Sequence, residues 1–126
     1  MIPTFIRSYQ AAVDVEGRRI VRFAAPSADQ TVDVTVANSE VGIGISDFLG
    51  AEAGQMLDVH RSGLSSVELG DTVEAGDPLT SDATGRAVKA VAAASTTVWI
   101  IGYADSAGVV GDYIDCFVAP SALHQA

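Results

Sequence analysis

The sequence predicts an all-β protein, a small β-barrel or β-sandwich with an extended N-terminal arm and little helix. Short segments rich in Val, Ile and Thr alternate with Gly, Asp, Ser and Pro along the chain, which is the pattern of strands and turns. The nearest helix candidate covers residues 46–53, where Gly50 and Gly54 limit any helix to one or two turns. Because Ala and Val supply many of the hydrophobic residues, we expect a core of small side chains.

The chain divides into an N-terminal arm, residues 1–10, and a single β domain, residues 11–126. In "TVDVTV" (31–36) strict alternation places Val32, Val34 and Val36 on an inward face. Near the C-terminus the same alternation assigns Ile114, Cys116 and Val118 to the core. The strands expected in the domain are, in order, 18–24, 31–36, 55–61, 85–91, 97–104 and 112–118.

Turn signals are densest in residues 68–90. Two Gly-Asp pairs, at 70–71 and 76–77, flank a very short strand, and "DATGRA" (82–87) has the composition of a hairpin turn in which Gly85 takes a positive φ. Asp71, Asp77 and Asp82 do not have the alternating acidic spacing of a calcium-binding loop. We therefore expect these aspartates to bond to the backbone of their own turns.

A weak internal repeat relates residues 44–59 to residues 102–116. Both stretches read Gly-x-small-Asp, then a Gly-containing loop, then Gly-x-x-aliphatic-Asp. This alignment pairs Asp47 with Asp105 and Asp58 with Asp115. It predicts two similar β-loop-β units lying side by side.

Size and charge restrict the possible partners. The 126 residues are enough for one domain, and the net charge of −9 disfavours direct binding to nucleic acid or to an anionic membrane. The chain opens without a signal peptide and contains no apolar run of about 20 residues, so we expect a soluble protein made in the host cytoplasm. Cys116 is the single cysteine, which excludes an intrachain disulfide. We predict no metal and no cofactor.

The sequence carries no catalytic signature. It lacks a Gly-x-Ser-x-Gly motif, and His60 lies in an alternating strand segment beside Arg61. Asp58 and Asp115 could be read as a glycosidase pair, but we expect them to be solvated or bonded to loops. Lys89 could be the modified lysine of a carrier hairpin, although no Met or Asp adjoins it. We predict that the protein is not an enzyme.

Surface binding is the remaining kind of function, and the N-terminus offers the clearest candidates for it. Residues 1–9 carry more apolar surface than a free terminus normally exposes. Arg18, Ile20 and Arg22 alternate onto one strand face, which is either ordinary solvated surface or a basic contact for an acidic partner. Trp99 is expected at a subunit interface. The predicted partner-binding residues are Ile2, Pro3, Phe5, Ile6, Arg7, Tyr9, Arg18 and Arg22.

The C-terminal half resembles the capsid decoration, or cement, proteins of tailed bacteriophages. In that family "AGDPLTSD-x-x-G-x-AV" is followed by a Gly-x-Ala strand and a terminal "GD-x-I-x-V-x-x-x-P" strand. The matching residues here are 75–82, Gly85, Ala87, Val88, 102–104, Gly111, Asp112, Ile114 and Pro120, with Cys116 where the family usually has Val.

This resemblance implies a β-rich virion protein, usually trimeric, that binds the major capsid protein on the outer surface of an icosahedral shell and holds capsomers together against genome pressure. On this basis we expect the arm to lie across the shell protein or a neighbouring subunit, so that removing residues 1–9 abolishes decoration while the body still folds. Two alternatives stay open at this point: another virion part, such as a tail or fibre-base module, and a biotinyl- or lipoyl-like carrier domain.

Overall fold

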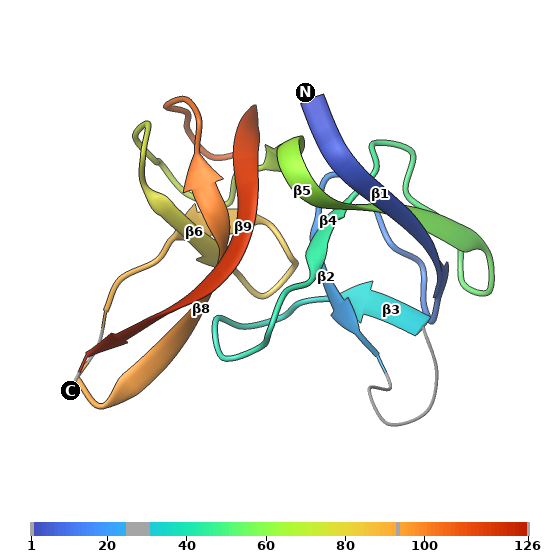
Figure 1. Ribbon diagram of the computed structural model, residues 1–126, viewed down its shortest axis with the longest axis horizontal. Helices are drawn as coiled ribbons and strands as arrows, with labels where there is room; N and C mark the ends of the chain where they lie inside the picture. The colour runs from blue at the N-terminus through green and yellow to red at the C-terminus, as the bar shows by residue number, and fades with distance from the viewer. Residues whose placement is uncertain (1, 25–30, 93, 126) are drawn as a thin grey trace.

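The computed structural model describes residues 2–24, 31–92 and 94–125, and every regular element in this part of the chain is a strand (Figure 1). The prediction of an all-β protein is therefore confirmed, and residues 47–53 contain no helix. The nine strands are β1 (Ile2–Ala11), β2 (Ile20–Phe23), β3 (Thr31–Val34), β4 (Gly44–Ser46), β5 (Met56–Glu68), β6 (Pro78–Ser81), β7 (Ala87–Lys89), β8 (Thr96–Ala104) and β9 (Tyr113–Gln125).

The strands form two rings that share β5. The first ring runs β1, β3, β2, β4, β5 and returns to β1. The second runs β5, β9, β8, β6, β7 and is closed by a parallel bridge between Leu69 and Ala87. Strand β5 changes its main partner from β1 to β9 at residues 63–64. In Figure 1 the first ring lies on the right and the second on the left, with β5 between them.

The two rings are copies of one unit, which confirms the internal repeat and extends it along most of the chain. The amide of Asp47 donates to the carbonyl of Asp58, and the amide of Asp105 donates to the carbonyl of Asp115, both at 2.9 Å. The strand registers agree as well. Ala11↔Val32 of the first ring corresponds to Leu69↔Ala87 of the second. Val21↔Gly44 corresponds in the same way to Leu79↔Gly102. Ile45↔His60 corresponds to Tyr103↔Phe117.

Two main cores of largely small aliphatic side chains hold the rings together. The first core lies in the first ring, whereas the second core contains Ile20 of β2 and Ile45 of β4 as well as residues of the second ring, so it packs the two rings against each other. Tyr9 is the aromatic residue in the core of the first ring. The predicted inward face of β9 is correct, since Ile114, Cys116 and Val118 are all buried in the second core. Aromatic residues lie largely outside: six of the eight have exposed side chains, namely Phe5, Phe48, Trp99, Tyr103, Tyr113 and Phe117.

The inward face predicted for residues 31–36 is only partly right. Val32 is buried, but β3 ends at Val34, and Val36 is half exposed. Thr35 takes the inward position in its place, with its hydroxyl 3.0 Å from the carbonyl oxygen of Ile20 and 2.6 Å from Ser81 Oγ. These partners satisfy the buried hydroxyl, so the strand can end without leaving a polar atom unpaired.

The turn between β6 and β7 has the predicted form. Gly85 has a φ of 80°. One carboxylate oxygen of Asp82 accepts the amides of Thr84 and Arg86 at 2.8 and 3.0 Å. Asp82 thus bonds to the backbone of its own turn, as expected of an Asx turn.

The arm expected at residues 1–10 lies within the sheet. Strand β1 pairs with β5 from Ile2 to Gln10 and meets β3 at its end. Tyr9 and Ala11 are part of the first core. Removing residues 1–9 would therefore delete a strand as well as a surface, so the first ring would not survive the deletion that we considered above.

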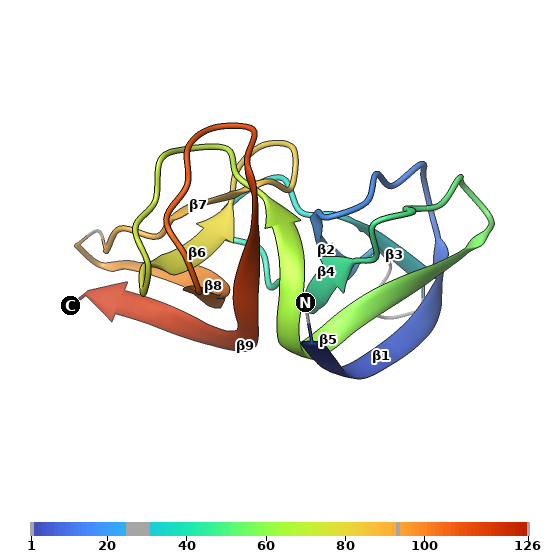
Figure 2. The ribbon, with the colours of Figure 1, turned by 90° about the horizontal axis from the view of Figure 1, so that it is seen from above.

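Loops and strand bends lie on opposite sides of the molecule. Figure 2 shows the loops 12–19, 47–55, 69–77 and 105–112 along one side, and the bends of β1, β5 and β9 along the other. These four loops contain nine of the sixteen acidic residues and two arginines. One side of the protein is therefore strongly acidic.

Candidate docking surface

The exposed apolar residues of β1 are the first part of the candidate surface. Ile2, Phe5 and Ile6 have 67%, 52% and 48% of their surface exposed. Pro3 lies between them, opposite Gly63 of β5, where the register of the two strands shifts. The side chains that the sequence assigned to partner binding are thus held on a paired strand, which fixes their positions before any partner arrives.

Tyr9 has a different environment from the rest of the predicted set. Its ring is 1% exposed and packs edge-on against Phe23 at 5.6 Å, and its hydroxyl accepts a 2.6 Å hydrogen bond from Arg61. The guanidinium of Arg7 lies 5.1 Å from the centre of this ring. In this structure Tyr9 supports the core and holds Arg7, so it offers no surface for direct contact.

Arg18 and Arg22 do not share a strand face, contrary to the alternation expected from the sequence. Strand β2 begins at Ile20, which is buried, and Arg18 precedes it with a φ of 60°. Arg22 forms ion pairs with Asp33, at 3.5 Å, and with Glu40. Arg18 instead stacks over the ring of Tyr113, with its guanidinium carbon 4.4 Å from the ring centre.

A row of apolar residues continues the surface of β1 across the sheet, and the sequence interpretation did not include it. We call Ile2, Leu64, Phe117 and Tyr103 the apolar row. They are register neighbours on β1, β5, β9 and β8, so their side chains share one face. Phe117 and Tyr103 are 53% and 42% exposed. Alternation in residues 112–118 could have revealed Phe117, because Cys116 and Val118 were already assigned to the core.

Trp99 lies where β8 and β9 extend away from the second ring. It is 36% exposed and faces Ala122 in the register. Its amide donates to the carbonyl of Asn38 and its carbonyl accepts the hydroxyl of Thr80. A small groove of about 170 Å³ beside it is lined by Val41, Gly42, Trp99, Ile100, Pro120 and Ser121.

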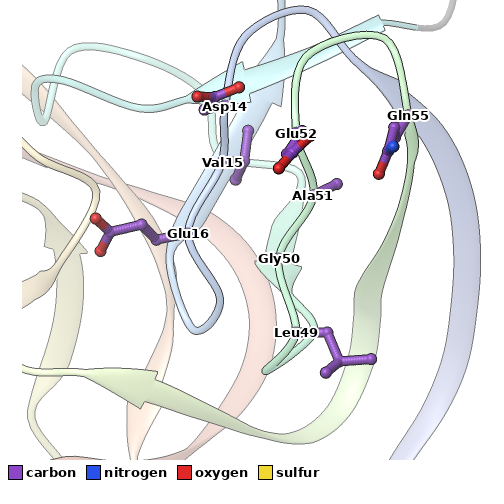
Figure 3. Close-up of a pocket in the computed structure, with 8 residues that line it drawn as sticks. All are labelled: Asp14, Val15, Glu16, Leu49, Gly50, Ala51, Glu52 and Gln55. Carbon is purple, nitrogen blue, oxygen red and sulfur yellow. The ribbon is translucent and has the colours of Figure 1, made fainter.

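An open acidic depression of about 460 Å³ lies between loops 12–19 and 47–55. Figure 3 shows the side chain of Glu16 directed away from those of Asp14 and Glu52. Glu16 pairs with Arg19 at 2.7 Å, and Asp14 accepts the amide of Ala53 at 2.9 Å. Two of the three carboxylates thus stabilise the loops. Across the described part of the chain, no group of three or more His, Cys, Asp or Glu side chains could hold a metal ion.

Burial is the largest cause of the pKa shifts of His60 and Cys116, two titratable residues in the interior. His60 Nδ1 lies 2.8 Å from Ser65 Oγ, and Nε2 lies 3.5 Å from Asp47. Burial raises the pKa of the Cys116 thiol to about 12, and the residue lies in the second core. Cys116 is therefore a protonated core residue at neutral pH. Lys89 lies in β7 beyond the hairpin turn, 3.9 Å from Asp77, and not at a tip as a carrier domain requires.

Lowering the pH from 7 to 5 is expected to destabilise the protein through His60. Burial lowers the pKa of His60 below 6.5, and Asp47 and Asp58 only partly oppose this. The unfolded chain then binds the proton more readily, so the stability from neutral His60 is complete above pH 6.5 and declines as the pH falls towards the folded-state pKa. Melting temperatures of the native protein and of His60→Gln should converge as the pH falls. If the two melting temperatures instead fall in parallel with pH, a group other than His60 causes the loss of stability.

The fold and the exposed aromatic face are typical of a structural protein that acts through its surface. Comparison with known proteins specifies the class further. The model of a family described as phage cement protein matches residues 8–113, and the chain belongs to that family. It is therefore a structural component of a phage virion, associated with the capsid.

A solved structure shares this fold. The head fiber gp8.5 N base of bacteriophage phi29 superposes with a TM-score of 0.69 at 18% identity, over 91% of this chain and 93% of that chain. No curated protein matches the sequence. The described residues contain no helix that is long and apolar enough to cross a bilayer.

Proposed function

We propose that the protein binds the outer face of the major capsid protein in a phage shell and stabilises the shell. The observation that carries this proposal is the separation of two surfaces. The acidic loops lie on one side of the molecule and the bends of β1, β5 and β9 on the other (Figure 2). Exposed apolar side chains lie on β1 and β9, namely Ile2, Phe5, Ile6 and Phe117, and Leu64 of β5 lies between Ile2 and Phe117 in the register.

Physical chemistry favours this orientation. Removing apolar side chains from water stabilises a complex by about 25 cal/mol for each Å² buried. Most of the acidic loop surface would remain in solvent, where its charges keep their hydration. The loops also expose Phe48, Leu49, Val109 and Val110, so the two sides of the protein differ in charge more than in apolar surface. A negatively charged outer side helps to keep coated particles apart.

Self-association into trimers is the second element of the proposal. Trp99 and the groove beside it supply an exposed aromatic residue next to a depression, a combination that frequently anchors subunit contacts. Three linked copies would also bind a shell more tightly than one, since each further contact is intramolecular. Analytical ultracentrifugation in solution, compared with occupancy on the shell, distinguishes a stable trimer from one that forms only on binding.

The test of the proposal uses phage heads that are expanded but undecorated. The purified protein should co-sediment with them to saturation and should raise the temperature at which they rupture. A tail preparation is the matched control, because a tail module is one of the alternatives that the sequence leaves open. Binding to tails and not to heads would reject the capsid proposal, and binding to heads without a change in rupture temperature would support a fibre-base role.

A further inference from the structure

Arg18 has an unusual backbone conformation for its residue type. Its φ is 60°, and the corresponding position in the second unit is Gly76, whose φ is 89°. The two amides make equivalent bonds, from Arg18 to the carbonyl of Ser46 at 3.1 Å and from Gly76 to that of Ala104 at 2.7 Å. The unit therefore requires a residue in the left-handed backbone conformation at this position, and glycine adopts that conformation without strain. An arginine at this position costs folding stability.

The side chain of Arg18 is held by three separate segments. Its Nε donates to Ser66 Oγ of β5 at 3.2 Å. Its guanidinium carbon lies 4.4 Å from the ring centre of Tyr113 at the start of β9, and 5.8 Å from that of Phe48 in the loop after β4. We call Arg18, Phe48 and Tyr113 the Arg18 cluster. Its geometry is set by both units before any ligand binds.

Arg18 forms no ion pair with a carboxylate of the described residues. Arg19, Arg22 and Arg86 each form ion pairs with carboxylates, whereas no carboxylate in residues 2–24, 31–92 and 94–125 lies within 4.0 Å of the Arg18 nitrogens. This is notable in a chain of net charge −9. The two terminal nitrogens of the guanidinium can therefore receive an external carboxylate in bidentate geometry.

The surroundings of the cluster favour a protein partner. Phe48 and Tyr113 are 53% and 59% exposed. Tyr113 and Phe117 are separated by an even number of residue positions along β9, and the register of β9 with β5 is unbroken between them. Their side chains therefore point to the same face of the sheet. Asp115, opposite Ser66, lies between them on the same face of β9, so one carboxylate separates the cluster from the apolar row. Arginine and tyrosine surrounded by apolar surface is the composition in which binding energy concentrates at protein interfaces.

We propose that the Arg18 cluster binds an aspartate or glutamate side chain on an apolar loop of the shell protein. This inference rests on the proposed function: it extends the proposed contact along the outward face of β9, from Phe117 to Tyr113, as far as loops 12–19 and 47–55, which carry Arg18 and Phe48. A second copy of this chain is a less suitable occupant, because the proposed trimer contact uses Trp99 and the groove beside it on β8 and β9. The strained backbone of Arg18 is then explained by function, because it places a fixed positive charge at a position where the second unit has glycine.

The experiment replaces Arg18 with the residue that the second unit uses at this position. Arg18→Gly removes the side chain and relieves the backbone, so the melting temperature should stay the same or rise. Affinity for undecorated heads should fall by about tenfold or more, and the remaining binding should depend less on salt. Arg18→Lys, which keeps the charge but loses the planar fork, should bind with intermediate affinity.

Lys89→Ala is the matched control, because it also removes one positive charge from an exposed side chain. It should bind as the native protein does. Equal affinity of Arg18→Gly and native protein for heads would overturn this inference and leave the proposed function intact. The same losses in Lys89→Ala would show a net-charge effect and would also overturn it. Loss of self-association in Arg18→Gly alone would identify a second copy as the occupant and reject the shell-protein assignment.

Discussion

Replacing Gly102 with alanine is expected to lower the unfolding free energy by about 4 kcal/mol and the melting temperature by more than about 10 °C. Gly102 lies in β8, where a Cβ would overlap the carbonyl group of Phe117 on β9. Relief of this overlap requires the two strands to separate, and β8 and β9 form the longest ladder of the second ring. Thermal unfolding followed by circular dichroism gives the measurement.

The repeat supplies an internal comparison for this prediction. Gly44 occupies the corresponding place in the first ring, and a Cβ there would lie 2.5 Å from the carbonyl oxygen of His60, so Gly44→Ala should be similarly severe. Gly111→Ala is the matched control: its φ is 89°, but no atom beyond the adjoining residues lies within 4 Å of the added carbon. That change should cost only about 1 to 2 kcal/mol. A Gly102→Ala protein as stable as Gly111→Ala would show that the strands tolerate the wider spacing.

Replacing Phe5 and Ile6 together with serine is expected to weaken binding to undecorated heads by at least about 100-fold. Both side chains are about half exposed in the free protein, and full burial of each against a partner would contribute about 1.5 to 3 kcal/mol. Three linked copies would multiply the loss. Titration of heads with labelled protein, followed by sedimentation, measures the affinity.

Stability should change little in this double variant, because the core residues of β1, Tyr9 and Ala11, are unchanged. Val91→Ser is the control: Val91 is 68% exposed and lies after β7, away from β1. If the double serine variant saturates heads at the native concentration, β1 is not part of the contact. A fall in its melting temperature by several degrees would instead attribute lost binding to a loosened first ring.

Local chemistry explains which parts of this fold could be predicted from the sequence. The turn at 82–86 depends on Asp82 and Gly85 alone, and the inward face of β9 depends on simple alternation, so both predictions are confirmed. The internal repeat was detectable in residues 44–59 and 102–116 because the loops need Gly and Asp at fixed places. Elsewhere the two units share strand register but hardly any residues, and register is invisible in one sequence.

The features that the sequence did not predict correctly share one cause: contacts between residues distant in the chain override the local pattern. Val36 would face inward if β3 continued, but the partners of Thr35 come from Ile20 and Ser81, distant in the chain. The Arg18 cluster likewise joins residues 18, 48 and 113, which no spacing rule connects. The arm was expected to be separate because its apolar residues stand out, and only the pairing with β5 shows that it is a strand of the ring.

The sharing of β5 gives the chain a direction of assembly. Once residue 69 has left the ribosome, every strand of the first ring is available, and that ring can close. The second ring uses residues 63–68 of β5 in the place that β1 has in the first ring. Because these residues belong to a strand of the first ring, the second ring closes after the first. A defect in the first ring therefore passes to the second, whereas a chain truncated after residue 69 still contains one complete unit.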